Sequence, residues 1–180
     1  MKLQVRNVTW KSRKVKEIYL DSFPKKERMP FWTMLLLSKM DSTKFWEFSD
    51  GETVCGFAYV AAVQNIVFIM FLAVDPACRS RGYGSAALAE IARRFPQSKI
   101  LVSIEQCAEG AENLEQRKRR KRFYLENGYE ETGFMTELSN VKQEILIQNG
   151  EFDPDEFAAF FKAYSNGTMN PRIWKAEEAE

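Results

Sequence analysis

The sequence predicts an α+β protein with a mixed, mostly antiparallel central sheet and helices on both faces. Three observations predict this fold class: a meander of apolar segments over residues 44–74, a strand–helix–strand segment over residues 66–104, and a closing hairpin over residues 129–148. Tight turns such as Asp50-Gly51 connect the meander segments, as is typical of antiparallel strands. The strand–helix–strand segment predicts one parallel neighbour, joined by a right-handed crossover.

The elements before the meander follow from apolar spacing and prolines. Apolar and polar residues alternate at residues 3–5, which predicts a first strand. Thr9 can cap the helix that follows. The apolar face of that helix is formed by Val15, Ile18, Tyr19 and Leu20. Pro24 and Pro30 place a loop before a second helix at about residues 31–39.

The remaining elements are bounded by glycine, proline and acidic caps. The meander strands are expected at residues 45–48, 54–63 and 66–74. Ser85 opens a helix that Pro96 ends, a strand follows at residues 99–104, and a charged helix ends at Asn127-Gly128. The hairpin strands are expected at residues 129–138 and 141–148. Asp153-Pro154 begins a last helix that reaches about Tyr164, and the tail from Asn170 is expected to be loose.

Length and composition predict one domain over residues 1–180, with a core at about 1–149 and an appended helix at about 153–165. Hydrophobic residues make up 45% of the chain and the formal net charge is +1, which argues against disorder and against a dedicated nucleic-acid binder. The first six residues have no apolar signal core, and no apolar run has the length of a membrane span. We therefore expect a cytoplasmic protein with neither nucleic-acid nor membrane partners.

The chain contains no histidine, which excludes a Ser-His-Asp triad, a Cys-His pair and histidine-ligated metals. Its three cysteines, Cys55, Cys78 and Cys107, have no metal-binding spacing, so we expect no metal site and no disulfide framework. The chemistry must use carboxylates, Tyr, Lys, Cys, Ser or backbone amides.

The segment Arg79-Ser80-Arg81-Gly82-Tyr83-Gly84 lies between an apolar strand and a helix. Glycines allow a ligand to approach the backbone, and the amides of a helix N-terminus favour a pyrophosphate. Arg79 and Arg81 add cationic donors. An ordinary glycine-rich connection is the simpler alternative, but the arginines and the flanking strand and helix favour a phosphate site.

A dinucleotide-binding fold is a second alternative. Gly82-Tyr83-Gly84-Ser85-Ala86-Ala87 fits the relaxed G-x-G-x-x-A pattern, and Glu105 lies near the distance of a ribose-binding acid. However, residues 75–81 separate the strand from the first glycine, and too few strand–helix units follow to extend a parallel sheet.

Two motifs resemble those of the GCN5-related N-acetyltransferase (GNAT) family. The loop matches the family's R/Q-x-x-G-x-G/A pattern, and Phe123-Tyr124-Leu125-Glu126-Asn127-Gly128-Tyr129 matches its F-Y-x-x-x-G-F/Y pattern, in the family's order. The strand before the loop also resembles the family's pantetheine-binding strand. The resemblance implies acetyl-CoA as co-substrate. It assigns coenzyme contacts to Leu72, Ala73, Val74, Arg79, Ser80, Arg81, Gly82, Tyr83, Gly84, Ser85 and Tyr124.

The resemblance also implies catalytic roles. A backbone amide at residues 72–74 stabilises the oxyanion, and Tyr124 occupies the general-acid position, with orientation of the sulfur or a core aromatic role as alternatives. The base is expected to be a carboxylate acting through water. Glu105 is slightly preferred because its strand neighbours are apolar, and Glu27 is the second candidate, although both also fit solvated surface acids. Cys107 can be a nucleophile, but an incidental cysteine is favoured.

The run Arg117-Lys118-Arg119-Arg120-Lys121-Arg122 departs from the family pattern, which has asparagine and a small residue where this chain has Arg117 and Arg120. Three interpretations remain open: a grip on the coenzyme's 3′-phosphate, a patch for nucleic acid or acidic protein, or a solvated face. In the last, and simplest, the run pairs with Glu109, Glu112, Glu115 and Glu126.

We therefore predict an N-acetyltransferase that acts on a primary amine, with a small molecule favoured as the acceptor. A protein N-terminal or lysine acetyltransferase and a non-catalytic acetyl-CoA sensor are the alternatives. The hairpin and the last helix offer a surface for a homodimer.

Overall fold

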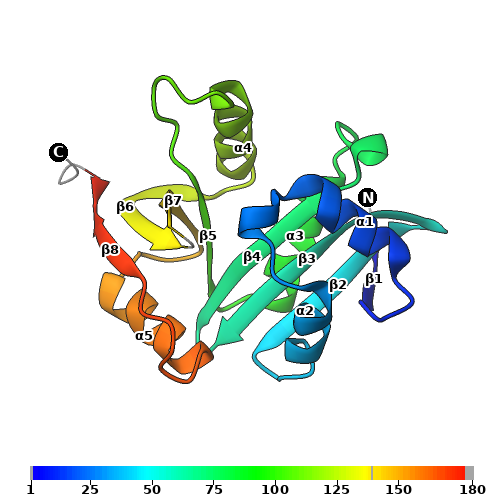
Figure 1. Ribbon diagram of the computed structural model, residues 1–180, viewed down its shortest axis with the longest axis horizontal. Helices are drawn as coiled ribbons and strands as arrows, with labels where there is room; N and C mark the ends of the chain where they lie inside the picture. The colour runs from blue at the N-terminus through cyan, green and yellow to red at the C-terminus, as the bar shows by residue number, and fades with distance from the viewer. Residues whose placement is uncertain (1, 139, 177–180) are drawn as a thin grey trace. The chain divides into compact units, whose positions relative to one another are not determined.

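The computed structural model describes residues 2–138 and 140–176 (Figure 1). Its elements in chain order are β1 (Gln4–Asn7), α1 (Arg13–Ser22), η1 (Lys25–Glu27), α2 (Phe31–Leu37), β2 (Thr43–Asp50), β3 (Thr53–Val63), β4 (Ile66–Val74), η2 (Pro76–Cys78), α3 (Tyr83–Arg94), β5 (Lys99–Glu105), α4 (Leu114–Glu126), β6 (Glu130–Leu138), β7 (Val141–Gln148), α5 (Pro154–Tyr164) and β8 (Arg172–Lys175). The strands form a mostly antiparallel sheet in the order β1-β2-β3-β4-β5-β7-β6-β8. The predicted α+β class is confirmed.

The chain divides into two compact units. Of the described residues, the first contains 2–62 and 69–96, and the second contains 63–68, 97–138 and 140–176. The prediction of a single domain remains a prediction.

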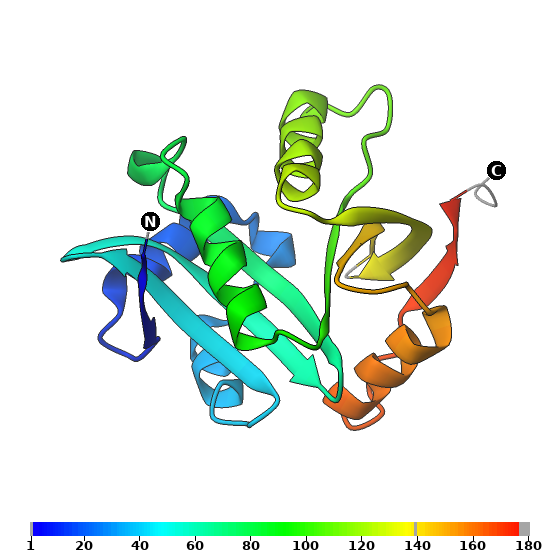
Figure 2. The same cartoon turned by 180° about the vertical axis from the view of Figure 1, so that it is seen from behind.

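In the first unit, helices cover both faces of the meander. Figure 1 shows α1 and α2 on one face, and Figure 2 shows α3 on the other. The α1 face is packed by aromatic rings, with Tyr19 meeting Phe57 and Phe71 edge to face at centroid distances of 5.9 and 5.3 Å. Phe45 adds an edge contact to Tyr59 at 5.2 Å. Such pairs contribute beyond their buried area, so this cluster holds α1 firmly on the strands.

The start and the apolar face of α1 differ from the prediction. Its N-cap residue is Ser12 rather than Thr9, because the Ser12 amide bonds the Thr9 carbonyl in a turn that precedes the helix. Val15 and Tyr19 are buried as predicted, but Leu20 is 43% exposed. One helical step of 100° carries Leu20 past the buried stripe and into solvent.

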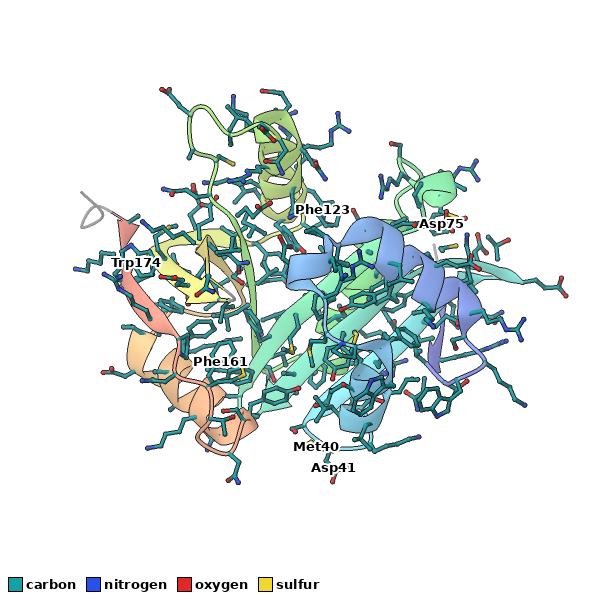
Figure 3. All side chains as sticks on the ribbon, in the orientation of Figure 1. Met40, Asp41, Asp75, Phe123, Phe161 and Trp174 are labelled. Atoms are coloured by element: carbon teal, nitrogen blue, oxygen red, sulfur yellow. The ribbon has the colours of Figure 1, made fainter. Side chains whose placement is uncertain are left out.

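In the second unit, β7 pairs antiparallel with both β5 and β6. The buried Phe157 and Phe161 of α5 contact Phe68 at ring distances of 5.7 and 5.3 Å (Figure 3 labels Phe161). The predicted cap is confirmed, because Asp153 Oδ1 accepts hydrogen bonds from the amides of Asp155 and Glu156.

The expectation of a loose tail from Asn170 is wrong for residues 172–175. These residues form β8, which pairs antiparallel with β6 and places Trp174 opposite Met135. A four-residue strand has too short a pattern to be detected locally, and the outer edge of β6 supplies the hydrogen-bonding partners that stabilise it.

Within the described ranges, no helix combines the length and apolar character of a membrane span.

Candidate functional site

The predicted phosphate loop connects β4 to α3 in the first unit. The Asp75 amide donates to the Cys55 carbonyl at 2.8 Å, which ties the start of the loop to β3. Ser80 and Gly82 have φ angles of +60° and +81°. Glycine adopts this left-handed conformation without a steric penalty, so Gly82 allows the sharp entry into α3.

The N-terminus of α3 presents backbone amides without helical partners. The first hydrogen bond into the helix runs from the Ala86 amide to the Gly82 carbonyl at 3.0 Å. The N-cap residue Gly82 has no side chain that could accept a hydrogen bond from the first amides. The amides of residues 83–85 precede that bond, and the helix dipole adds partial positive charge there. Arg79 and Arg81 are exposed in the same loop. This geometry suits a phosphate or pyrophosphate.

An ion pair between a buried carboxylate and a half-exposed lysine fixes the start of the loop. Asp75 is 4% exposed, and its Oδ2 lies 2.6 Å from Lys14 Nζ of α1. Its Oδ1 accepts the Ala77 amide at 2.8 Å. The hydrogen bond from Lys14 and that from Ala77 lower the pKa of Asp75 below its ordinary value. Figure 3 labels Asp75 at the end of β4.

Tyr83, predicted to contact the coenzyme, has a partner of its own. Its hydroxyl donates to Asp50 Oδ2 at 2.8 Å, joining the first turn of α3 to the end of β2. This hydrogen bond to a carboxylate is the main cause that raises the pKa of Tyr83 to about 12. The phenol therefore stays neutral at physiological pH and fixes the helix start.

The predicted pantetheine strand ends at Leu72, Ala73 and Val74 of β4. Ala73 is buried, and its carbonyl lies only 2.4 Å from where a Cβ on Gly56 would stand. Glycine at position 56 therefore allows β3 and β4 to approach closely beside the loop. The bulge that would free an amide at residues 72–74 remains a prediction.

Tyr124 lies on α4 in the second unit and is 6% exposed. Its ring contacts Phe123 and Tyr129 at 5.2 and 5.3 Å, and Figure 3 labels Phe123 on this helix. Burial raises the pKa of Tyr124 to about 12, and the positive charge of Arg120 opposes that rise. Tyr124 is therefore a neutral hydrogen-bond donor at physiological pH.

The hydroxyl of Tyr129 is buried and has no hydrogen-bond partner among the described residues. Burial raises the pKa of Tyr129 above its ordinary value. A buried hydroxyl without a hydrogen-bond partner lowers the free energy of unfolding, so the Tyr129 hydroxyl is a destabilising group within this aromatic cluster.

The predicted base Glu105 is held by two arginines of α4. Its Oε1 accepts from Arg117 at 3.1 Å, and its Oε2 lies 3.8 Å from Arg120. Arg117 also donates to the Gln106 carbonyl at 2.8 Å. Glu105 therefore connects β5 to α4. Cys107 lies two residues further on and is a half-buried free thiol.

The basic run on α4 is largely paired, as the simplest interpretation expected, but mostly with other partners. Lys118 pairs with Glu115, one of the four predicted acids. Lys121 pairs with Glu144 at 2.8 Å and also with Glu131. These contacts attach α4 to β6 and β7.

The second predicted base, Glu27, is half-buried at the end of η1 in the first unit. Within that unit it follows α1, whereas α3 and its N-terminal amides cover the opposite face of the strands (Figures 1 and 2).

Three residues that hold the loop or its flanking strand in place were not predicted: Lys14, Asp50 and Gly56. Only the isolated glycine inside a strand pattern offered a signal in the sequence.

The comparison with family models identifies a family. The family model described as "Acetyltransferase (GNAT) domain" matches residues 41–131. No curated protein matches the chain by sequence.

Solved structures share the fold at low sequence identity. A Bacteroides thetaiotaomicron protein described as a GNAT-family acetyltransferase has a TM-score of 0.72 at 18% identity, covering 90% of this chain and 96% of its own. The ribosomal-protein-S18-alanine N-acetyltransferase of Escherichia coli has a TM-score of 0.61 at 13% identity, covering 85% and 97%. An Elizabethkingia anophelis GNAT acetyltransferase with acetyl-CoA bound has a TM-score of 0.57 at 12% identity, covering 82% and 97%.

The matched segment begins before β2 and ends in β6, so it contains the β4–α3 loop and Tyr124. The resemblance inferred from the two motifs is confirmed, and the chain belongs to the GNAT family of acetyltransferases.

Proposed function

We propose that this chain binds acetyl-CoA at the β4–α3 loop and transfers the acetyl group to a primary amine. The observation that carries the proposal is Gly82 at φ +81°, directly before the unpartnered amides that begin α3. A dinucleotide would also suit such amides, but the family membership favours acetyl-CoA.

In this proposal the coenzyme's pyrophosphate accepts hydrogen bonds from the amides of residues 83–85, and Arg79 and Arg81 neutralise its charge. The pantetheine arm lies along Leu72, Ala73 and Val74. The Elizabethkingia anophelis structure, whose fold this chain shares, holds acetyl-CoA, which supports this choice of co-substrate.

The transfer begins when the neutral amine attacks the thioester carbonyl carbon. The carbonyl π electrons move to oxygen and give a tetrahedral oxyanion, which a backbone amide at residues 72–74 stabilises. The C–S bond then breaks, its electron pair stays on sulfur, and the amine nitrogen loses a proton to a base. The products are an amide and the coenzyme A thiolate, and the proton held by the base returns through solvent to the thiolate to give coenzyme A.

Tyr124 serves the leaving sulfur mainly as a hydrogen-bond donor. Proton transfer from a phenol of pKa about 12 to a thiolate whose acid has a pKa of about 8.5 is uphill by roughly 5 kcal/mol. A hydrogen bond to the developing negative charge carries no such cost. This favours the orienting role over full donation.

Glu27 is the better candidate for the base. The two oxygens of Glu105 face Arg117 and Arg120, so Glu105 must leave these partners before it can accept a proton. Glu27 makes no ion pair within the described ranges and lies in the connection between α1 and α2. It would act through a water molecule.

The acceptor is proposed to be a small-molecule amine. A protein N-terminal amine is the second candidate, because the Escherichia coli structure that shares this fold is named as a ribosomal-protein alanine N-acetyltransferase. A protein that binds acetyl-CoA but transfers nothing is the third. These three classes differ in whether, and with which amines, free coenzyme A is released.

The test is a thermal melt with acetyl-CoA and, separately, NADH at equal concentration, followed by an assay of thiol release. A ligand present at about 100 times its Kd raises the free energy of unfolding by about 2.7 kcal/mol. We expect a rise in Tm with acetyl-CoA alone, then thiol release with small amines. A rise with NADH alone would contradict the coenzyme assignment, and binding without release across small amines and alanine-terminated peptides would indicate a sensor.

A further inference from the structure

A cavity of about 730 Å³ lies on α1, η1 and the start of α2, entirely within the first unit. Its lining includes two tryptophans and four cations: Trp10, Trp32, Arg13, Lys16, Lys25 and Arg28. Among the described residues, no carboxylate lines it, although Glu17, Asp21 and Glu27 lie on the same elements.

This cavity is separate from the coenzyme loop. It shares no lining residue with residues 79–85. Within the first unit, α1 and α2 cover one face of the strands and α3 covers the other (Figures 1 and 2). A ligand in this cavity therefore contacts a different surface from the amides that begin α3.

Arg28 has an unsatisfied donor at this site. Its Nε is buried and has no hydrogen-bond partner within the described ranges. Arg13, Lys16 and Lys25 form none of the ion pairs found within those ranges, whereas most of the α4 basic run is paired. Four unpaired cations around one cavity repel one another, and a bound anion relieves that repulsion.

The position of Arg28 is fixed by its neighbour. The Met29 amide donates to the Tyr19 hydroxyl at 2.8 Å, and that hydroxyl donates to the Met29 carbonyl at 3.1 Å. Tyr19 is fully buried in the aromatic cluster under α1. The backbone beside Arg28 is therefore anchored to the core, which prepares the guanidinium for an anion.

The apolar part of the cavity is exposed to solvent. Trp10 is 74% exposed and Trp32 is 57% exposed. Leu20, Met29 and Phe31 line the cavity between the cations. Indole rings left in water lose the free energy that burial would give, and a flat apolar group stacked on them would recover it.

We propose that this cavity binds a small molecule that carries a carboxylate or a phosphate beside a flat apolar ring. The guanidinium of Arg28 matches the planar geometry of a carboxylate or two oxygens of a phosphate. The volume lies in the range of small-molecule sites. Aromatic ring faces can also bind a cationic ligand, but the four cations of this cavity would repel one.

The experiment is a ¹⁹F NMR titration of the full chain labelled with fluorotryptophan. The chain has four tryptophans, so it gives four signals, which single Trp→Phe variants assign. The probes are benzoate and phenyl phosphate, with acetate and inorganic phosphate as ringless anions and benzylamine as the cationic match for benzoate. The two aromatic anions distinguish carboxylate from phosphate.

We expect at least one aromatic anion to shift the Trp10 and Trp32 signals saturably and to leave those of Trp46 and Trp174 unchanged. The ringless anions and benzylamine bind at least tenfold more weakly. Arg28→Gln raises Kd several-fold, and so does Arg13→Gln, which changes an exposed side chain and should not disturb folding. Lys39→Gln removes an exposed cation outside the cavity and leaves Kd unchanged. Gly82→Val keeps the shifts, which separates this site from the coenzyme loop.

Three results would overturn the proposal. Benzylamine binding as well as benzoate would remove the role of the cations. Aromatic anions that bind Arg28→Gln and Arg13→Gln as tightly as the original chain would do the same. A dimer in sedimentation velocity that Trp32→Ala dissociates would show that a second copy covers this face.

Discussion

Lys14 Nζ lies 2.6 Å from Asp75 Oδ2, so a side chain of α1 holds the first residue after β4. This carboxylate is buried, whereas half of the Lys14 side chain is exposed. The pair connects the aromatic cluster under α1 to the segment that leads into the coenzyme loop. Its charges give the first prediction.

The stability that Asp75 contributes depends on pH. Lys14 lowers the pKa of Asp75, so this contribution is present above the carboxyl's ordinary pKa of 3.8 and is lost as pH falls through the folded value. Asp75 raises the pKa of Lys14, so the lysine's contribution is present below 10.5 and is lost as pH rises through its folded value. Asp75→Asn keeps an acceptor for the Ala77 amide but removes the charge.

We therefore expect Asp75→Asn to lower the Tm by a constant amount between about pH 4 and pH 10, with the difference shrinking below and above that window. Melts across pH measure it. Glu17→Gln is the control, because the exposed Glu17 lies 3.8 Å from Lys14 and should matter little. A deficit that stays the same at pH 2.5 would show that charge is not the cause.

Gly82→Val is expected to abolish acetyl-CoA binding, because a branched side chain would stand beside the amides that meet the pyrophosphate. The left-handed φ of +81° adds a stability cost of about 1–2 kcal/mol. Gly167→Val is the matched control: its φ is +85° and, as at Gly82, open space surrounds the point where a Cβ would stand. Isothermal titration should show lost binding only for Gly82→Val, and equal affinity in the two variants would contradict the loop assignment.

Tyr124→Phe is expected to reduce kcat by about 10- to 100-fold, below the roughly 100- to 10,000-fold contribution of a full general acid, because its hydroxyl orients the sulfur without transferring its proton. The Kd for acetyl-CoA should change less than threefold. Single-turnover kinetics and calorimetry separate the two quantities. Unchanged turnover at all pH values would remove Tyr124 from the reaction.

Tyr129→Phe is the companion variant. The hydroxyl it removes is buried and unpartnered within the described ranges. Its removal should leave the free energy of unfolding unchanged or raise it by about 1 kcal/mol. Urea unfolding measures this change, and a clear loss of stability would reveal a partner for that hydroxyl.

Glu27→Gln and Glu105→Gln should have different effects. Glu27→Gln is expected to lower kcat and to remove the acidic limb of its pH profile, because a base must be deprotonated to act. Glu105→Gln is expected to lower the Tm, since it weakens the contacts of β5 with Arg117 and Arg120. If Glu105→Gln instead removes the acidic limb, the roles are exchanged.

Local patterns in the sequence were sufficient for most elements. The apolar run at β4 and the polar break before β7 gave both strands their observed bounds. Asp153 and Pro154 began α5 because a cap and a first-turn proline act within a few residues. The family pattern identified the loop because glycine at position 82 is a backbone requirement.

Long-range contacts could not be predicted in the same way. Nothing near Lys14 indicates Asp75, and nothing near Lys121 indicates Glu131 or Glu144. These partners meet only when the sheet brings distant strands together. The apolar neighbours of Glu105 on β5 therefore favour a role as base, whereas its arginine partners lie on another element.

The pairing of β6 with β8 has a consequence for synthesis on the ribosome. β6 emerges before β7, α5 and β8, so its outer row of amides and carbonyls has no strand beside it until residues 172–175 are made. An open strand edge can pair with a neighbouring nascent chain. Once β8 arrives, Arg172 and Lys175 place a charge at each end of the new edge, and such charges oppose further strand addition.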